Sequence, residues 1–434
     1  MLSKADNERM CRVGADTPMG KAFRHYWLPV MLSSELPEAD GAPVPVEVCG
    51  EKIVVFRDSA GTIGALAEHC CHRGASLLLG RVEDCGIRCI YHGWKFAADG
   101  TVLDTPNVAD PRFKDRFRAR SYPIHDAGGL AWIYLGDPAE APPLPRWGFM
   151  DVPESNRLPV VAVVNCNYVQ LMEGVVDSSH LSILHTVGLK ATDAAELDFA
   201  KKTNHMQFDA APRLEAEETD FGFHYVALRQ NDRGEEPVTE ARVAAFVAPC
   251  FVLNPNGDLF FSFTPINDER VLFFHVWWDA EKKFGEEPLR TQQLSFVGLD
   301  HETLAEFGMT RETSVLPDRA RRENNFHQDR DALRRGHFTG LPGFTQEDAA
   351  VSMSGGPIRD RSKEMLSHAD VAIGRLYRSL LKCAKRAEAG EEPVGMHADV
   401  TRISGACGVL KQEQPWRDLV PTHQPAKKTV ALVP

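Results

Sequence analysis

The sequence contains no hydrophobic run long enough to cross a membrane. Its longest apolar stretches, such as Val271 to Trp278, are far shorter than the roughly 20 residues that span a bilayer. The first residues, MLSKADNERMCRVG, contain no apolar segment of the kind found in secretory signals. A formal net charge of −12 and the lack of a long basic run argue against nucleic acid or an anionic membrane surface as partners. We therefore expect a cytoplasmic protein.

Cysteine is too scarce for a disulfide scaffold, with ten residues in 434. Six of them are scattered, whereas Cys70, Cys71, Cys85 and Cys89 lie close together in the sequence. In a reducing compartment such a cluster indicates a metal site rather than disulfides. The chain also lacks internal repeats and low-complexity tracts, and its length suits two domains with a substantial core.

The first 150 residues predict a small all-β domain. Residues 4–28 favour a short helical lead-in, after which short apolar runs alternate with Gly, Asp and Pro. The proline-rich segment 137–145 is of the stiff, extended kind, so we place a domain boundary near residue 150. The candidate strands, whose number and shortness are typical of compact all-β units, are residues 44–48, 52–57, 62–68, 88–96 and 130–135.

Residues 151–434 predict a second domain of the α+β class. A buried strand at 160–166 precedes a helix that starts near Tyr168, and apolar residues at helical spacing between Leu366 and Leu380 predict another helix. A curved antiparallel sheet with helices packed on it is the expected architecture, because short turns separate the strand signals. Those signals lie at residues 203–208, 214–219, 223–229, 240–251, 259–264 and 271–278.

Two short motifs in the first domain place one cysteine and one histidine on each of two arms. They are Cys70-x-His72 and Cys89-x-x-His92. Zinc binds two cysteines and two histidines in a tetrahedron, whereas a Rieske [2Fe–2S] cluster takes two thiolates on one iron and two imidazoles on the other. One Cys and one His per arm favours the cluster, because zinc sites usually pair cysteines on one arm. A structural zinc site is the alternative.

The residues that flank the two arms extend the pattern. The arms read Cys-x-His-Arg-Gly-Ala and Cys-x-x-His-Gly-Trp-Lys-Phe, which resembles the Rieske domain of aromatic-ring oxygenases. The resemblance implies that Cys70 and Cys89 hold one iron of the cluster and that His72 and His92 hold the other. Cys71 departs from the family pattern, in which proline or another small residue is frequent, and we interpret it as a bystander.

The stretch Glu173 to His185, which reads EGVVDSSHLSILH, contains a second candidate metal site. If it is helical, Asp177 and His180 share a face, and His185 joins His180 only where the helix ends or bulges near residues 182–184. Two imidazoles and a carboxylate are the donors of a non-haem Fe(II) site. Taken alone, a histidine pair on an amphipathic helix is more often structural.

Next to a Rieske motif, this stretch resembles the catalytic-iron signature of the same family. The resemblance implies that His180 and His185 bind Fe(II) together with a later carboxylate, for which Asp348 is the first candidate and Glu347 the alternative. It also implies that Asp177 is not a ligand but bridges to a Rieske histidine of the adjacent subunit in a head-to-tail trimer. The alternative role for Asp177 is to orient His180 alone.

The resemblance further implies a fold and an activity. The family places a Rieske domain, here residues 1–150, before a helix-grip catalytic domain, here residues 151–434. We expect the terminal oxygenase component of a system in which a flavin/[2Fe–2S] reductase, with or without a ferredoxin, supplies electrons and O2 hydroxylates the substrate. The expected assembly is a homotrimer or a dimer of trimers. A Rieske electron carrier with an appended binding domain is the non-enzymatic alternative, although the chain is longer than such a carrier needs.

Within the family, the chain most resembles the phthalate dioxygenase-type oxygenases, which act on aromatic carboxylates without a separate β subunit. The cues are the opening MLSKADNERMCRVGADTPMG and residues 329–336 and 354–362. A benzoate-type anion in an apolar pocket needs a charged partner, and Arg213 and Arg242 match the carboxylate-binding arginines of this branch. Surface arginines in ion pairs are the alternative. O-demethylases of methoxyaromatic acids and diaryl-ether-cleaving enzymes belong to the same branch, and a steroid- or alkaloid-type Rieske monooxygenase would share both metal sites.

Overall fold

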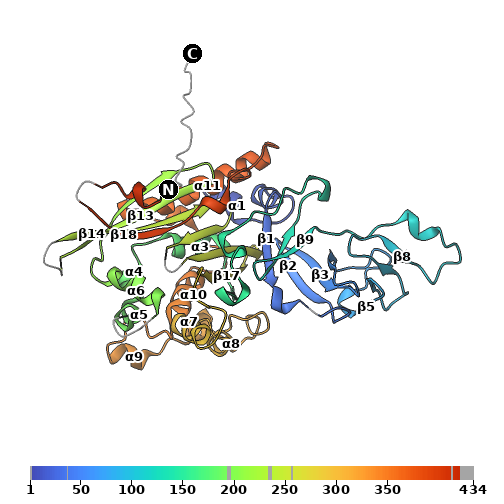
Figure 1. Ribbon diagram of the computed structural model, residues 1–434, viewed down its shortest axis with the longest axis horizontal. Helices are drawn as coiled ribbons and strands as arrows, with labels where there is room; N and C mark the ends of the chain where they lie inside the picture. The colour runs from blue at the N-terminus through green and yellow to red at the C-terminus, as the bar shows by residue number, and fades with distance from the viewer. Residues whose placement is uncertain are drawn as a thin grey trace, which may run out of the picture.

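The computed structural model describes residues 2–36, 38–192, 197–232, 237–255, 258–411 and 414–420. The molecule is elongated, with small sheets of the N-terminal part at one end and a large sheet covered by helices at the other (Figure 1). None of the helices in these described ranges is long and apolar enough to span a membrane.

Short antiparallel strands build the N-terminal part, as the sequence predicts. One sheet consists of β1 (Trp27–Leu32), β10 (Leu130–Tyr134) and β9 (Ile124–Ala127), and a second consists of β2 (Val44–Val48), β3 (Glu51–Arg57) and β4 (Ile63–Ala67). Strands β1 and β2 contact the large sheet. The sheet at the far end consists of β5 (Arg81–Glu83), β6 (Gly86–Arg88), β7 (Lys95–Phe96) and β8 (Val102–Asp104) (Figure 1). Part of this far end has a small core of its own, separate from the main core.

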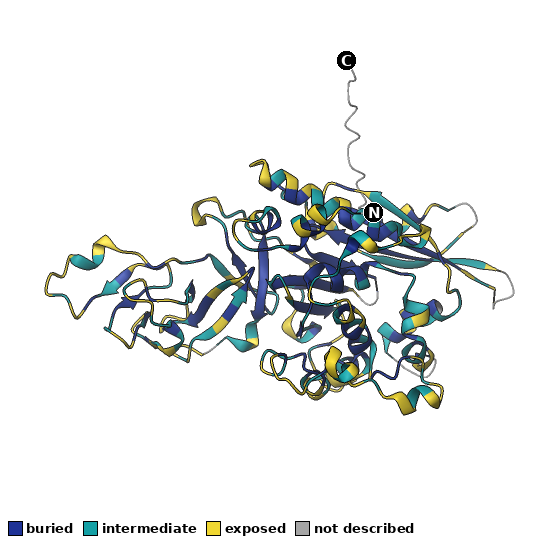
Figure 2. Ribbon diagram, turned by 180° about the vertical axis from the view of Figure 1, so that it is seen from behind, coloured by how far each residue is buried: buried dark blue, intermediate teal, exposed yellow. Residues whose placement is uncertain are grey.

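A large antiparallel sheet forms the centre of the C-terminal part. Its strands are ordered β11-β17-β16-β15-β14-β13-β12, and β18 also pairs with β14. Most of these strands are buried along nearly their whole length and appear dark blue in Figure 2. Their bounds are β11 (Arg157–Val164), β12 (Arg213–Glu218), β13 (Gly222–Asn231), β14 (Val238–Val247), β15 (Phe251–Asn254), β16 (Leu259–Asn267), β17 (Arg270–Trp278) and β18 (Ala406–Leu410).

Helices pack on this sheet, which confirms the predicted α+β class. Two of them, α3 and α10, contact each other, and α3 also contacts β16. The helices that follow β11 are α3 (Tyr168–Val176), α4 (Leu181–Leu184), α5 (Thr186–Ala191), α6 (Asp198–Thr203), α7 (Leu289–Val297), α8 (His301–Phe307), α9 (Arg330–Arg334), α10 (Phe344–Ser354) and α11 (Val371–Glu388).

The N-terminal lead-in packs on the C-terminal part rather than on the small sheets. Its helices α1 (Lys4–Cys11) and α2 (Pro18–Phe23) contact α11, and α1 also contacts α3. The Tyr168 hydroxyl donates to the Met10 carbonyl oxygen at 2.7 Å. The buried apolar side chains of α1 and α2 thereby join the main core, which also includes residues of β1, β2, β3 and β10.

Two predicted strands are wrong. The loop at residues 89–94 divides the predicted strand 88–96 into β6 and β7. The predicted strand 203–208 is occupied by the end of α6 and a 3-10 helix at Asn204–Gln207. Ala200, Thr203 and Met206 are buried at a spacing of three, so one helical face meets the core. The Thr203 hydroxyl donates to the Phe199 carbonyl oxygen at 2.9 Å, which suits a helix and not a strand.

Candidate active site

The stretch Glu173–His185 is not one continuous helix. α3 ends at Val176, and Asp177 caps it with extended backbone angles. His180 directly precedes α4, and His185 separates α4 from α5 with φ −92° and ψ 24°. The interruption that the histidine spacing requires is therefore present, because α4 ends at Leu184, within the predicted residues 182–184.

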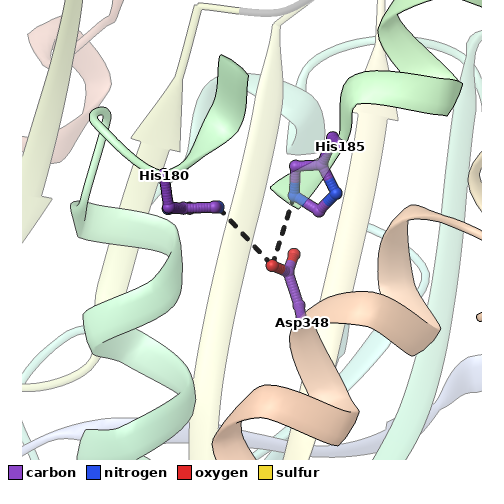
Figure 3. A group of neighbouring side chains, drawn as sticks. All are labelled: His180, His185 and Asp348. Atoms are coloured by element: carbon purple, nitrogen blue, oxygen red, sulfur yellow. Dashed lines mark ion pairs between the residues drawn. The ribbon is translucent and has the colours of Figure 1, made fainter. Parts of the chain in front are cut away.

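Both imidazoles point toward one carboxylate, that of Asp348 on α10 (Figure 3). His185 Nε2 lies 3.3 Å from Asp348 Oδ1, and His180 Nε2 lies 3.6 Å from the same oxygen. One ligand atom from each of the three residues lies within 4.8 Å of the other two. More than 160 positions separate Asp348 from the histidines in the sequence, and the fold brings them together because α10 packs against α3.

These three side chains fit a mononuclear non-haem iron. Two imidazole nitrogens and one carboxylate oxygen occupy one face of an octahedron and leave positions open for other ligands. His180 Nε2 is buried without a hydrogen-bond partner, as expected for an atom whose partner is a metal. Glu347, the alternative ligand, instead lies behind His185, with Oε2 2.7 Å from Nδ1.

The charges around the three side chains are strongly coupled. Burial favours the neutral form of His180, but Asp177 and Asp348 outweigh it and raise the pKa of His180 to about 9. Burial would raise the pKa of Asp348, whereas the adjacent His185 and His180 imidazoles hold it well below its usual value. An anionic carboxylate between two imidazoles is a favourable place for a divalent cation.

Asp177 lies behind His180 on the side away from Asp348. Its Oδ2 is 3.5 Å from His180 Nδ1, and its Oδ1 accepts hydrogen bonds of 2.7 Å from both the backbone N–H and the hydroxyl of Ser179. Asp177 also lines an open hollow on the outer side of α3, which His180 shares. The carboxylate is therefore positioned between an imidazole and the protein surface.

The two Cys/His arms form matching loops, one between β4 and β5 and the other between β6 and β7. The Cys70 N–H donates to the Ala75 carbonyl oxygen, and the Cys89 N–H donates to that of Trp94, both at 2.8 Å. Gly74 and Gly93 occupy the same place in the two loops, with φ of +73° and +76°. Glycine adopts this left-handed backbone without strain, which explains its presence in both arms.

The loops present two thiols and two imidazoles to one another. Cys70 and Cys89 are buried, whereas His72 and His92 are half-buried and their ring centroids lie 4.5 Å apart. The Trp94 ring stacks on His72 at 4.6 Å, and His72 Nδ1 is buried without a hydrogen-bond partner. Buried sulfurs behind partly exposed imidazoles fit a [2Fe–2S] cluster held at the protein surface.

A largely apolar cavity lies beside the His180–His185–Asp348 group. Its walls come from the large sheet, from α5 to α7 and from α10, and three polar residues of the sheet line it, Arg242, Asn254 and His275. The apolar and aromatic lining includes Leu189, Leu259, Phe261, Phe273, Trp277, Val297, Leu299 and Phe344. Such a lining with few polar groups is typical of a binding site for a small aromatic molecule.

The structure separates the two predicted substrate arginines. Arg242 on β14 is buried and lines the cavity, with Nη1 3.2 Å from Ser178 Oγ. The Arg213 side chain is 73% exposed and lies 3.5 Å from Glu215, so it is not placed to meet a molecule in this cavity. The strand register explains the difference, because Arg213 pairs with Leu228 and Arg242 pairs with Ala227, and consecutive residues face opposite sides of a sheet.

Two buried residues near the cavity were missed in the sequence. His275 on β17 lines the cavity, its Nδ1 has no hydrogen-bond partner, and burial lowers its pKa to about 3, so it is neutral. Arg229 on β13 donates to the Ser178 carbonyl oxygen at 2.6 Å, and burial and the nearby Arg242 lower its pKa to about 10. The available signal was the same for both, a polar residue that directly follows a run of buried residues within a strand.

Family models match most of the chain. A Rieske [2Fe-2S] domain matches residues 26–123, and a domain described as LigXa C-terminal domain like matches residues 133–432. These two matches cover the sheets that carry the Cys/His loops and the large sheet with its helices, respectively.

Characterised proteins resemble the chain over nearly its whole length. The phthalate 4,5-dioxygenase oxygenase subunit of Pseudomonas putida is 34% identical over 430 residues, which cover 96% of this chain and 94% of that protein. The 3-chlorobenzoate-3,4-dioxygenase oxygenase subunit of Comamonas testosteroni is 36% identical over 410 residues, with 91% and 92% covered. Dicamba monooxygenase bound to dicamba has a similar fold, with a TM-score of 0.55 and 19% identity over 85% of this chain and 99% of that one.

Proposed function

The chain belongs to the Rieske non-haem iron oxygenases, as an oxygenase subunit of the phthalate dioxygenase type, and on this basis we propose that it hydroxylates an aromatic carboxylate. Oxygenase components of this kind carry a Rieske [2Fe–2S] cluster and a mononuclear iron, and they use O2 and a separate reductase. The observation that carries the substrate proposal is the cavity beside the iron-binding group, with its aromatic walls and its buried Arg242.

The metal-binding roles follow the geometry of the two sites. Cys70 and Cys89 hold one iron of the cluster, and His72 and His92 hold the other. His180, His185 and Asp348 hold the mononuclear iron. Buried thiols behind facing imidazoles support the first assignment, and three convergent donor atoms support the second. Bound in these places, the two groups supply single-electron transfer and a binding site for O2.

The remaining site residues bind and orient the substrate, and they exclude water from it. Arg242 holds the substrate carboxylate by charge-assisted hydrogen bonds, and the neutral His275 forms a second polar contact. Both lie on the sheet side of the cavity, so an aromatic ring held by them faces the His180–His185–Asp348 group across the apolar walls. These walls exclude bulk water from the reacting ring.

Metal content and substrate-dependent O2 uptake test this proposal together. We expect about three irons and two labile sulfides per chain, and O2 uptake with a surrogate reductase on at least one of phthalate, chlorobenzoates, methoxybenzoates or biaryl acids. Product identification then separates ring hydroxylation from O-demethylation. About two irons per chain, with no substrate-dependent O2 uptake, would indicate an electron carrier instead.

A head-to-tail oligomer, a trimer or a dimer of trimers, completes the proposed enzyme. The sheet of β5 to β8 lies at one end of the molecule, whereas α4 and α10 lie beside the large sheet, so a chain's own cluster and its iron-binding group belong to different parts of the molecule (Figure 1). The hollow beside Asp177 is rimmed by exposed apolar side chains, among them Ile183, Val351 and Met365, and Met365 is 94% exposed. Exposed Ile90 flanks the Rieske histidines, so both surfaces suit contact with another protein.

Charge complementarity supports the same arrangement. Arg73, next to the ligand His72, is exposed and lies 5.5 Å from the centre of the Tyr91 ring. The hollow beside Asp177 is also lined by Glu364 and Asp370. A basic and aromatic edge on one chain therefore matches an acidic and apolar hollow on the next. In this position Asp177 lies between His180 and a Rieske histidine of the neighbouring chain.

A further inference from the structure

Glu347, which directly precedes Asp348 on α10, holds the opposite edge of His185. We infer that Glu347 is a positioning residue: together with Thr339, it fixes the orientation and tautomer of His185 so that Nε2 faces the metal. The inference rests on the proposed role of His185 as an iron ligand.

The two neighbouring carboxylates contact both nitrogens of one imidazole. Asp348 Oδ1 lies 3.3 Å from His185 Nε2, and Glu347 Oε2 lies 2.7 Å from His185 Nδ1. Consecutive residues of an α-helix point about 100° apart, so one turn of α10 can present a carboxylate to each edge of the ring. The ring therefore cannot rotate without losing a contact at one nitrogen or the other.

Thr339 fixes the second oxygen of the Glu347 carboxylate. Its hydroxyl donates to Glu347 Oε1 at 2.5 Å, and the Leu341 N–H donates back to the same hydroxyl oxygen at 3.2 Å. His185, Glu347 and Thr339 are all buried. Both carboxylate oxygens are thus engaged inside the protein, and the group that holds His185 is itself held by the segment that leads into α10.

This arrangement determines which ring nitrogen is available for a metal. A carboxylate accepts hydrogen bonds, so Nδ1 of His185 holds its proton on Glu347, and when a metal lies between Nε2 and Asp348 the Nε2 lone pair is the one free to bind it. The corresponding contact behind His180 is looser, because Asp177 Oδ2 is 3.5 Å from Nδ1. Carboxylates that orient a metal-binding histidine in this way typically change metal affinity by about 10- to 100-fold. We therefore infer that His185 is held in its orientation more firmly than His180.

Fe(II) affinity, measured by chelator competition on protein that retains its Rieske cluster, tests the assignment. We expect Glu347→Met, which removes both acceptor oxygens, to weaken Fe(II) binding by about 10- to 100-fold. Glu347→Gln keeps an oxygen that accepts from Nδ1 and should recover part of this loss. Thr339→Val should weaken binding less than Glu347→Met, because the carboxylate remains. The absorption bands of Co(II) bound in place of iron should shift in the same order, since they report ligand geometry.

Two further variants make the outcomes distinguishable. Thr264→Val removes another buried hydroxyl, one that contacts Ser262 Oγ on the face of β16 opposite to the cavity-lining Phe261, and should bind Fe(II) like the unmodified protein. Asp348→Ala tests the iron site itself, and if it retained full affinity the proposed function would fail. If Asp348→Ala lost iron while the Glu347 and Thr339 variants bound it normally, only the positioning role would be overturned. Should Glu347→Met fail to fold, Glu347→Gln and Thr339→Val give the same decision.

Discussion

Arg242 and Ser178 link the cavity wall to the corner that carries Asp177. Arg242 Nη1 lies 3.2 Å from Ser178 Oγ, and the same guanidinium lines the cavity. Ser178 lies between α3 and His180, so the arginine that we propose to bind the substrate carboxylate also contacts the segment that orients a proposed iron ligand. A molecule that binds Arg242 is therefore linked to the iron site through Ser178.

Arg242→Gln should weaken the binding of an aromatic acid. A hydrogen bond to a charged group contributes about 1.5–3 kcal/mol, which corresponds to roughly a 10- to 100-fold loss of affinity. Substrate-induced changes in the absorption or EPR spectrum of the metal centres give this affinity directly. Arg213→Gln is the matched control and should leave it unchanged, since Arg213 is exposed and pairs with Glu215. Equal effects of the two substitutions would contradict this assignment.

Asp177→Asn should leave both metal sites filled and the Rieske cluster reducible, yet reduce turnover by about 10- to 100-fold. The amide keeps the size of the carboxylate, but it carries no charge to stabilise the His180 imidazole and, in the proposed oligomer, the Rieske histidine of the neighbouring chain. Iron content, the spectrum of the reduced cluster and single-turnover electron transfer measure these properties separately. Normal electron transfer in the variant would rule out the bridging role, whereas loss of iron would assign Asp177 to the support of His180 alone.

Mixed oligomers should recover activity that neither parent has. A chain with His92→Ala lacks an intact Rieske site, and a chain with Asp348→Ala lacks an intact iron site. If electrons pass between neighbouring subunits, co-assembled chains regain about a quarter of full activity, because about a quarter of the head-to-tail contacts join the two intact sites. The measurement is product formation after co-expression. If electrons stay within one chain, the mixture remains inactive.

Arg361→Met should destabilise the C-terminal part. Arg361 is fully buried, its Nε donates to Glu173 Oε1 at 2.5 Å, and the Tyr377 hydroxyl donates to the same oxygen at 2.8 Å. Removing one partner of a buried ion pair costs about 3–5 kcal/mol, and we expect the lower end of this range because Arg359 Nη1, 3.3 Å from Glu173 Oε2, still faces the buried carboxylate. The free energy of unfolding by denaturant measures the loss. Arg334→Met, at an exposed ion pair with Asp331, is the control and should change stability by less than about 1 kcal/mol. Similar shifts in the two variants would show that the buried pair contributes little.

The sequence by itself determined the local chemistry. The Cys-x-His and Cys-x-x-His arms, and the histidines at 180 and 185, are short-range patterns in which spacing and residue type already specify the donors. The α+β class was also predictable, because strand and helix periods repeat over many residues. Most of the short strands of the first domain were recognisable for the same reason.

Only the tertiary structure decided which distant residues meet. Asp348 faces the two histidines and Glu347 lies behind His185. The two acids are adjacent in the sequence and chemically similar. The rotation of α10 about its axis therefore decides which carboxylate faces the metal position. Arg242 lines the cavity and Arg213 does not, because strand register determines which face of a sheet each side chain occupies. Contacts between segments far apart in the chain determine strand register, helix rotation and the packing of α1 and α2 on α11. No local pattern encodes these contacts.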